Sequence, residues 1–102
     1  MPEHVQYQMG YSEPEFEKVL KGDFSGANSA YVCLDNGDLS WRLKHRHDPM
    51  QVTIRIRQDQ PRQLGMLRLP VLQVSFALQD ATHTARTAFF DRFFKYFHKG
   101  GG

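Results

Sequence analysis

Cysteine is nearly absent from this sequence. The 102 residues include one cysteine, Cys33. A single thiol excludes an intramolecular disulfide and a metal cage built from thiolates alone. Because Cys33 has no catalytic base beside it in the sequence, we expect a small, partly buried side chain and no nucleophile.

Catalytic motifs are also lacking. The sequence has no glycine-rich phosphate loop and no Ser/His/Asp pattern. We therefore expect a protein that is not an enzyme and has no cofactor. His45 and His47 are spaced like some metal ligands, but a metal site needs three or four ligands and the sequence places no others nearby. No metal site is predicted, and His45 is expected on the core face.

Long hydrophobic runs are missing as well. The most apolar segment, Leu67 to Leu78, is interrupted by Arg68, Pro70 and further polar side chains, so it is too short and too polar to span a bilayer. The first residues do not combine a basic stretch with an apolar one, unlike a signal peptide. These absences predict a cytoplasmic protein without a membrane partner.

The composition is that of a folded chain. Apolar residues make up 40% and aromatic residues 13% of the sequence, unlike the composition of a disordered segment. A chain of this length forms one domain with one modest core. We predict a single α+β domain over residues 1–99 and a flexible glycine tail at residues 100–102.

Charge is distributed unevenly along the chain, although the net charge is only +2. Residues 1–41 contain seven acidic and two basic side chains, whereas residues 42–68 contain seven basic and two acidic ones. The near-neutral total therefore combines an acidic front with a basic middle.

Side-chain periodicity predicts the order of the elements. Residues 4–9 alternate like a strand, and Ser12 followed by Glu13 and Pro14 begins a helix of about ten residues that ends at Gly22. Strands follow, and Asp80 or Thr82 caps a final helix to about His98. We predict an antiparallel meander of four or five strands, with the short N-terminal helix before it and the long C-terminal helix packed on one face.

Three successive hairpins are expected within the meander. Asn36-Gly37 is the strongest hairpin signal, and a turn there pairs Val32 with Trp41. Loops at residues 47–50 and 60–63 then set Trp41 against Ile56 and Ile56 against Leu67. These registers keep one face of the sheet apolar, which a slip of one residue would destroy.

The strand after the third hairpin is predicted to be long. Its alternation changes phase at Pro70, which indicates a bulge within one strand from Leu67 to Leu78. Residues 72–78 overhang the hairpin partner, so they should pair with the strand at residues 4–9 or with another copy of the chain.

A basic surface results on the sheet face away from the core. One row across four strands contains three arginines, and like charges opposite each other on neighbouring strands are destabilising unless an anion is bound. The expected anion-binding residues are Tyr31, Arg42, Lys44, Arg55, Arg57 and Arg68. This surface predicts a module that binds a polyanion, with single-stranded nucleic acid as one candidate, although Tyr31 alone is available for base stacking.

Two alternatives accompany this hypothesis. The basic face is merely solvated, or acidic residues of the first helix cover and neutralise it. With a merely solvated face, the chain would be a homodimeric protein–protein interaction or regulatory module. The final helix supports a homodimer because phenylalanines fill about half of its circumference, more than one sheet requires. The dimer interface would then be this helix or the strand at residues 72–78.

Overall fold

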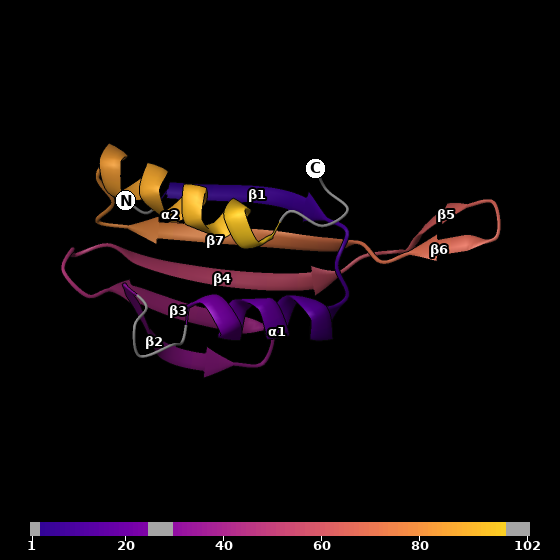
Figure 1. Cartoon of the computed structure of the whole chain (residues 1–102), viewed down its shortest axis with the longest axis horizontal. Helices are drawn as coiled ribbons and strands as arrows, with labels where there is room; N and C mark the ends of the chain where they lie inside the picture. The colour runs from indigo at the N-terminus through magenta and orange to yellow at the C-terminus, as the bar shows by residue number, and fades with distance from the viewer. Residues whose placement is uncertain (1–2, 25–29, 98–102) are drawn as a thin grey trace.

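The α+β fold expected from the sequence is confirmed. The computed structural model describes residues 3–24 and 30–97, so the glycine tail lies outside the described residues. Five antiparallel strands form one sheet in the order β1-β7-β4-β3-β2, and β5 and β6 form a separate hairpin (Figure 1). The elements are β1 (Glu3–Met9), α1 (Glu13–Phe24), β2 (Tyr31–Gly37), β3 (Ser40–His45), β4 (Gln51–Gln58), β5 (Arg62–Leu64), β6 (Leu67–Leu69), β7 (Leu72–Gln79) and α2 (His83–Tyr96).

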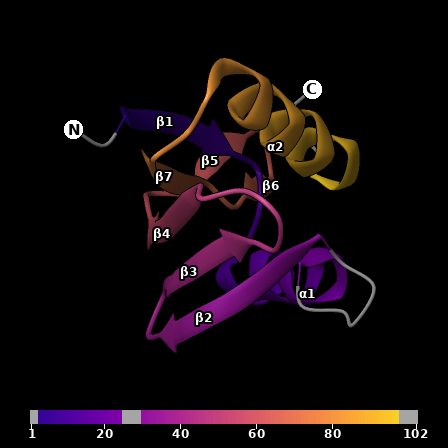
Figure 2. The same cartoon turned by 90° about the vertical axis from the view of Figure 1, so that its left-hand side faces the viewer.

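Both helices lie on the same side of the five-stranded sheet, as Figure 2 shows. Phe16 and Phe24 of α1 and Phe93 of α2 are fully buried. Phe93 approaches Phe16 and Phe24 with ring-centroid distances of 6.2 and 6.4 Å, and it meets Phe76 of the sheet at 5.0 Å. The two helices and the sheet therefore share one aromatic core.

This shared core accounts for the wide apolar arc of α2. The helix contacts the sheet on one side and α1 on another, so more of its circumference is buried than a helix on a sheet alone would need. Phe89, Phe90, Phe93 and Phe97 are all buried. The part of the arc that stays exposed is small and consists of Phe94 and Tyr96.

The helix starts are those that the sequence predicts. The Ser12 hydroxyl accepts a hydrogen bond from the Glu15 amide at 3.3 Å, and the Glu15 carboxylate accepts one from the Ser12 amide at 3.1 Å, which together form a capping box. The Thr82 hydroxyl caps α2 by accepting from the Ala85 amide at 3.1 Å. The expected end of α1 at Gly22 is wrong, because the helix continues to the buried Phe24.

The first hairpin turns two residues later than predicted. Asp38 and Leu39 form the turn, Asn36 pairs with Trp41, and the register shifts by one residue between Cys33 and Asp35. The predicted turn at Asn36-Gly37 and its pairings are therefore wrong. The shifted register places Tyr31 on the core side, 4% exposed, where its ring can join the aromatic cluster.

The second hairpin keeps the predicted faces with a different register. Trp41 pairs with Ile54 rather than Ile56, and Leu43 pairs with Val52. A shift of two residues leaves every side chain on its original face. The Lys44 ammonium donates to the carbonyl oxygens of His45 and Asp48 at 3.2 and 3.1 Å, so it fixes the connecting loop.

The predicted third hairpin and the bulge at Pro70 are wrong. β4 pairs directly with β7, with Ile54 opposite Phe76, while β5 and β6 pair only with each other. We call residues 62–69 the arm; it extends beyond one end of the sheet (Figure 1). The phase change at Pro70 therefore marks the point where the chain returns from the arm.

The overhanging strand finds its partner within the chain. β1 pairs with β7 along its whole length, with Val5 opposite Phe76. Of the two predicted partners for residues 72–78, the strand at residues 4–9 is therefore the one found. Because β1 and β4 occupy both edges of β7, β7 has no free edge for strand pairing with a second copy. The expected pairing of residues 72–78 with another copy of the chain is therefore replaced by pairing within the chain.

Phe93 and Phe94 provide a matched test of this core. Phe93→Ala removes a fully buried ring at the centre of the cluster and should lower the free energy of unfolding by about 3–5 kcal/mol. Phe94→Ala, at the 36% exposed neighbouring position, should lower it by a smaller amount, about 1–2 kcal/mol. Chemical denaturation of both variants measures the difference; equal losses would contradict the shared core.

Candidate anion-binding face

The sheet face opposite the helices carries polar side chains and no covering element among the described residues. We call it the open face. Strand alternation puts Trp41, Ile54 and Phe76 into the core, so their sequence neighbours point to the other side. The open face comprises Gln6, Ser40, Arg42, Lys44, Thr53, Arg55, Arg57, Gln73 and Ser75.

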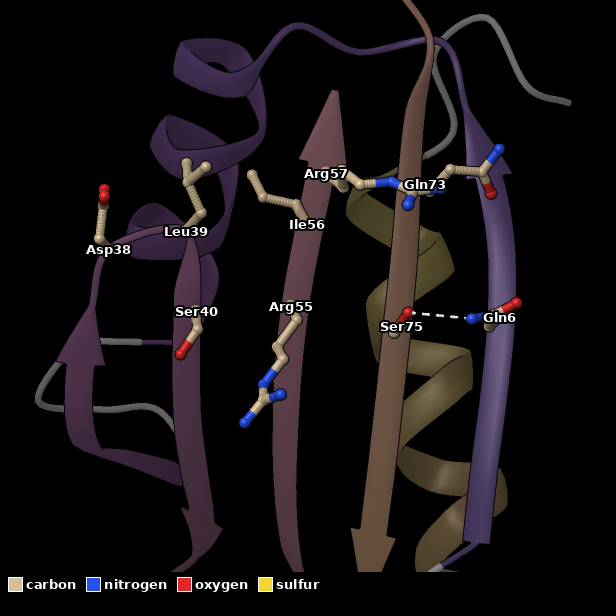
Figure 3. A pocket seen from close by; sticks show the side chains of 9 residues that line it. All are labelled: Gln6, Asp38, Leu39, Ser40, Arg55, Ile56, Arg57, Gln73 and Ser75. Carbon is tan, nitrogen blue, oxygen red and sulfur yellow. Dashed lines mark hydrogen bonds between the residues drawn. The ribbon is translucent and has the colours of Figure 1, made fainter. Parts of the chain in front are cut away.

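A shallow depression lies in the open face. It has a volume of about 650 Å³, and Figure 3 shows its lining side chains in front of the strands, with both helices behind. Its lining consists of Gln6, Asp38, Leu39, Ser40, Arg55, Ile56, Arg57, Gln73 and Ser75. A second hollow of about 370 Å³ shares Gln6, Arg55 and Ser75 with it, so Arg55 borders both.

The arginines are staggered across the open face. Arg55 lies opposite Ser40 on β3 and Ser75 on β7, and Arg42 lies opposite Thr53. The nearest cross-strand arginine is therefore diagonal, about 7–8 Å away, which is less unfavourable than a directly opposed pair. Within residues 3–24 and 30–97, neither Arg42, Arg55 nor Arg57 forms an ion pair.

Four of the six predicted site residues share this face. Arg42, Arg55 and Arg57 are exposed on it, and Lys44 also belongs to it, although its ammonium is bonded to two loop carbonyls. Two predicted positions are wrong. Arg68 lies on the arm, because β7 takes the place beside β4 that the sequence assigned to residues 67–69.

Tyr31 is the other incorrect assignment. Its ring packs against Phe24, Phe89 and His45 with centroid distances of 5.3, 5.7 and 5.1 Å. The exposed aromatic side chains of the described residues are Tyr7, Phe94 and Tyr96, and Tyr7 contacts the core rings Phe76 and Phe90. The open face therefore lacks the aromatic platform on which bases of single-stranded nucleic acids stack.

Gln6, Gln73 and Ser75 of the open face were not predicted as site residues from the sequence. The Gln6 amide donates to the Ser75 hydroxyl at 3.3 Å, which links β1 to β7 beside Arg55. Gln73 lies opposite Arg57. The alternation of residues 4–9 and 72–78 already placed these polar groups on one face, but their position beside the arginines depends on the β1-β7-β4 strand order.

The acidic first helix does not cover the open face. α1 packs through Phe16 and Phe24 on the opposite side of the sheet (Figure 2). Glu17 pairs with Lys21 on the same helix at 2.8 Å, and Glu15 is part of the capping box. Neutralisation of the basic face by α1, one of the two alternatives considered, is therefore wrong.

The histidine pair lies away from the arginines of the depression. The His45 Nδ1 atom accepts a hydrogen bond from the His47 amide at 3.1 Å, and the His45 ring contacts Tyr31. No group of three or more His, Cys, Asp or Glu residues with metal-site geometry occurs in the described part of the chain. The contacts of His45 are those of a side chain that supports the β3–β4 loop.

Asp59 lies at the base of the arm and contacts Gln73, which lines the depression. Its carboxylate accepts hydrogen bonds from the Gln73 amide at 2.9 Å and from the Gln60 backbone amide at 2.8 Å. The pKa of Asp59 lies below its ordinary value of 3.8. The hydrogen bond from Gln73 makes the largest contribution, followed by the bond from Gln60 and the positive charge of Arg57. All three favour the ionised carboxylate.

Comparisons with protein-family models, curated proteins and solved structures gave no match to this chain. No helix within residues 3–24 and 30–97 is long and apolar enough to cross a membrane.

The Asp59 contacts predict an acid-dependent contribution to stability. A lowered pKa means that the carboxylate stabilises the fold above about pH 4 and that this contribution disappears as the pH falls through the folded-state pKa. The pKa of Asp59, measured by NMR titration of its carboxyl carbon, should lie below 3.8 and should rise in Gln73→Met. A wild-type value at or above 3.8 would contradict the observed hydrogen bonds.

Proposed function

We propose that this protein is a non-enzymatic binding module whose open face holds an anionic partner through Arg55 and Arg57. One observation carries the proposal: these arginines lie on an uncovered sheet face and form no ion pair within the described residues. A partner that supplies phosphate or carboxylate groups would relieve their mutual repulsion.

The neighbouring side chains suit an anion of this kind. Guanidinium groups bind phosphate or carboxylate oxygens with two parallel hydrogen bonds. Gln6 and Gln73 add amide donors, and Ser40 and Ser75 add hydroxyl groups around the same depression. Arg42, one diagonal step from Arg55, extends the positive surface across β3.

The groups on this face favour recognition by charge. Without exposed aromatic rings, the face would contact the backbone of a nucleic acid, or the carboxylates of an acidic chain, rather than stack on bases. We therefore expect weak sequence preference and a strong dependence on salt. Guanidinium, amide and hydroxyl groups bind and orient anions, which supports a binding role over a catalytic one.

The competing hypothesis is a homodimeric interaction module with a merely solvated basic face. A homodimer was expected because apolar residues cover more of α2 than one sheet requires. Most of the phenylalanine rings of α2 are buried within the chain. Phe94 and Tyr96 are the exposed remainder, so less apolar surface is left on α2 for a dimer than the sequence suggested.

The test compares two matched double variants. Arg55→Gln/Arg57→Gln removes two charges from the open face, and Arg62→Gln/Arg68→Gln removes two from the arm. A fluorescent single-stranded oligonucleotide and heparin serve as probes, titrated at about 50 and 200 mM salt. The open-face variant should bind at least tenfold more weakly at low salt, and its salt slope should fall by about 1 for each arginine.

The arm variant should keep most of the wild-type affinity for both probes. Absence of wild-type binding at low salt, or equal losses in the two variants, would contradict the proposal. Light scattering of the same samples then tests the homodimer, which predicts twice the mass of the chain irrespective of the arginines.

A further inference from the structure

The arm is the least covered part of the molecule. β5 and β6 pair only with each other and are joined by a tight turn in which Gly65 has a positive φ of 60°. Figure 1 shows the arm at one end of the longest dimension of the molecule, which is 47 Å. A two-stranded hairpin by itself is at best marginally stable in water, so burial of its apolar groups against another surface would stabilise it.

Exposed apolar side chains are concentrated on the arm. Eight large hydrophobic residues are exposed in the described chain, and four of them lie within residues 62–69. Met66 at the turn is 99% exposed, Leu67 65% and Leu64 55%. Such a concentration on a protruding element is typical of a contact site rather than of ordinary surface.

The arm is ordered by chemistry from its tip to its base. Met66 occupies the tip, and the pair Leu64 and Leu67 lies directly behind it. Arg68 belongs to the next pair, with Gln63, and Arg62 to the one after, with Leu69, so the cations lie about 3–7 Å behind Leu64 and Leu67 along the strands. The sequence has no acidic residue from residue 60 to residue 79, so every charged side chain of the arm is basic.

The base of the arm is fixed to the sheet. The Asp59 amide donates to the Val71 carbonyl at 2.9 Å, and the Asp59 carboxylate accepts from Gln73 of β7. Pro61 and Pro70 restrict the backbone where the chain enters and leaves the hairpin. The tip is therefore held away from the body instead of folding back on it.

We propose that the tip of the arm inserts into the surface of a lipid bilayer that contains anionic lipid. Met66, Leu64 and Leu67 would reach the boundary between headgroups and acyl chains. Arg62 and Arg68 would then lie at the depth of the negatively charged headgroups, where each basic side chain strengthens attachment. This order of an apolar tip and a basic collar matches the layers of an anionic membrane surface.

Surface attachment differs from membrane spanning. The sequence predicted no membrane partner because no segment is long enough to cross a bilayer, and the arm does not alter that argument. A shallow, reversible contact needs only a few apolar side chains and nearby cations. The inference concerns the arm and is independent of the anionic partner proposed for the open face.

A bilayer fits the arm better than a second copy of the chain does. A stable protein interface takes about 20–30 residues on each side, and the arm offers eight residues on a narrow ribbon. A bilayer requires no complementary partner surface, and its interior accepts methionine and leucine side chains in any arrangement. The arginines, which would be brought together in a symmetric contact of two arms, are instead attracted to anionic headgroups.

The first experiment follows the tip directly. Met66→Trp is made in the full chain and mixed with phosphatidylcholine vesicles with or without phosphatidylserine. The natural Trp41 is only 3% exposed, so a change in emission reports the tip. We expect a blue shift with phosphatidylserine vesicles at low salt and a much smaller one with phosphatidylcholine alone. Absence of a shift with both vesicle types would overturn the proposal.

Matched variants then separate the two contributions in a vesicle sedimentation assay. Met66→Ser/Leu67→Ser should lower the partition coefficient at least about tenfold, because the inserted apolar area is lost. Arg62→Gln/Arg68→Gln should lower it about fivefold for each arginine, the change that corresponds to about 1 kcal/mol. Arg55→Gln/Arg57→Gln removes the same charge from the open face and should have a clearly smaller effect.

Three results would overturn the proposal. The first is that both arm variants bind vesicles as strongly as the wild type does. The second is that Arg55→Gln/Arg57→Gln lowers the partition coefficient as much as Arg62→Gln/Arg68→Gln does. The third is that light scattering without vesicles detects a dimer that Met66→Ser/Leu67→Ser abolishes, which would mean that the tip contacts a second copy of the chain. Because the oligonucleotide assay depends on Arg55 and Arg57 and the vesicle assay on the arm, failure of one proposal is distinguishable from failure of the other.

Discussion

Contacts among the phenylalanine rings of the two helices decide how this molecule is built. Phe93 stacks on Phe97 with a centroid distance of 4.2 Å and meets Phe76 of the sheet at 5.0 Å. Phe16 of α1 joins the same cluster. Since one cluster unites α1, α2 and the sheet, both helices must lie on the same side, and the second face of the sheet is left to water or to a partner.

The composition of the open face follows from this constraint. Side chains alternate between the faces of a strand, so the neighbours of the buried residues on β3, β4 and β7 face the other side, and most of these neighbours are polar. On β4, Ile54 is buried beside the rings while Arg55 faces outward. Serine and glutamine lie opposite Arg55 and Arg57, and Arg42 has Thr53 on one neighbouring strand and Asp35 on the other. These arginines are therefore not directly opposed to one another.

The arm results from the same competition for core positions. Leu72 and Phe76 alternate in step with the ring cluster and are buried, so β7 occupies the place beside β4. The leucines of residues 64–69 are then excluded from the core and project with the arm. Asp59 and Gln73 join the open face to the base of the arm, so the two surfaces meet at one corner of the sheet. Their chemistry differs, because the open face has cations among polar groups and the arm has an apolar tip.

Local patterns in the sequence determined much of this structure. The α+β class, the helix starts at Ser12 and Thr82, and the outward position of Arg55 and Arg57 follow from capping chemistry and from period-two alternation, which depend on near neighbours only. The acidic front and basic middle of the chain are visible in the same way.

Pairing register and strand order were decided only by the tertiary structure. The turn at Asp38-Leu39 replaced the favourable Asn36-Gly37 turn because the observed register buries Tyr31 against Phe24 and Phe89. The position of Arg68 depended on which segment pairs with β4. A turn preference or a local phase change involves a few residues, whereas burial of aromatic rings against two helices involves contacts between distant parts of the chain, which no local pattern of the sequence records.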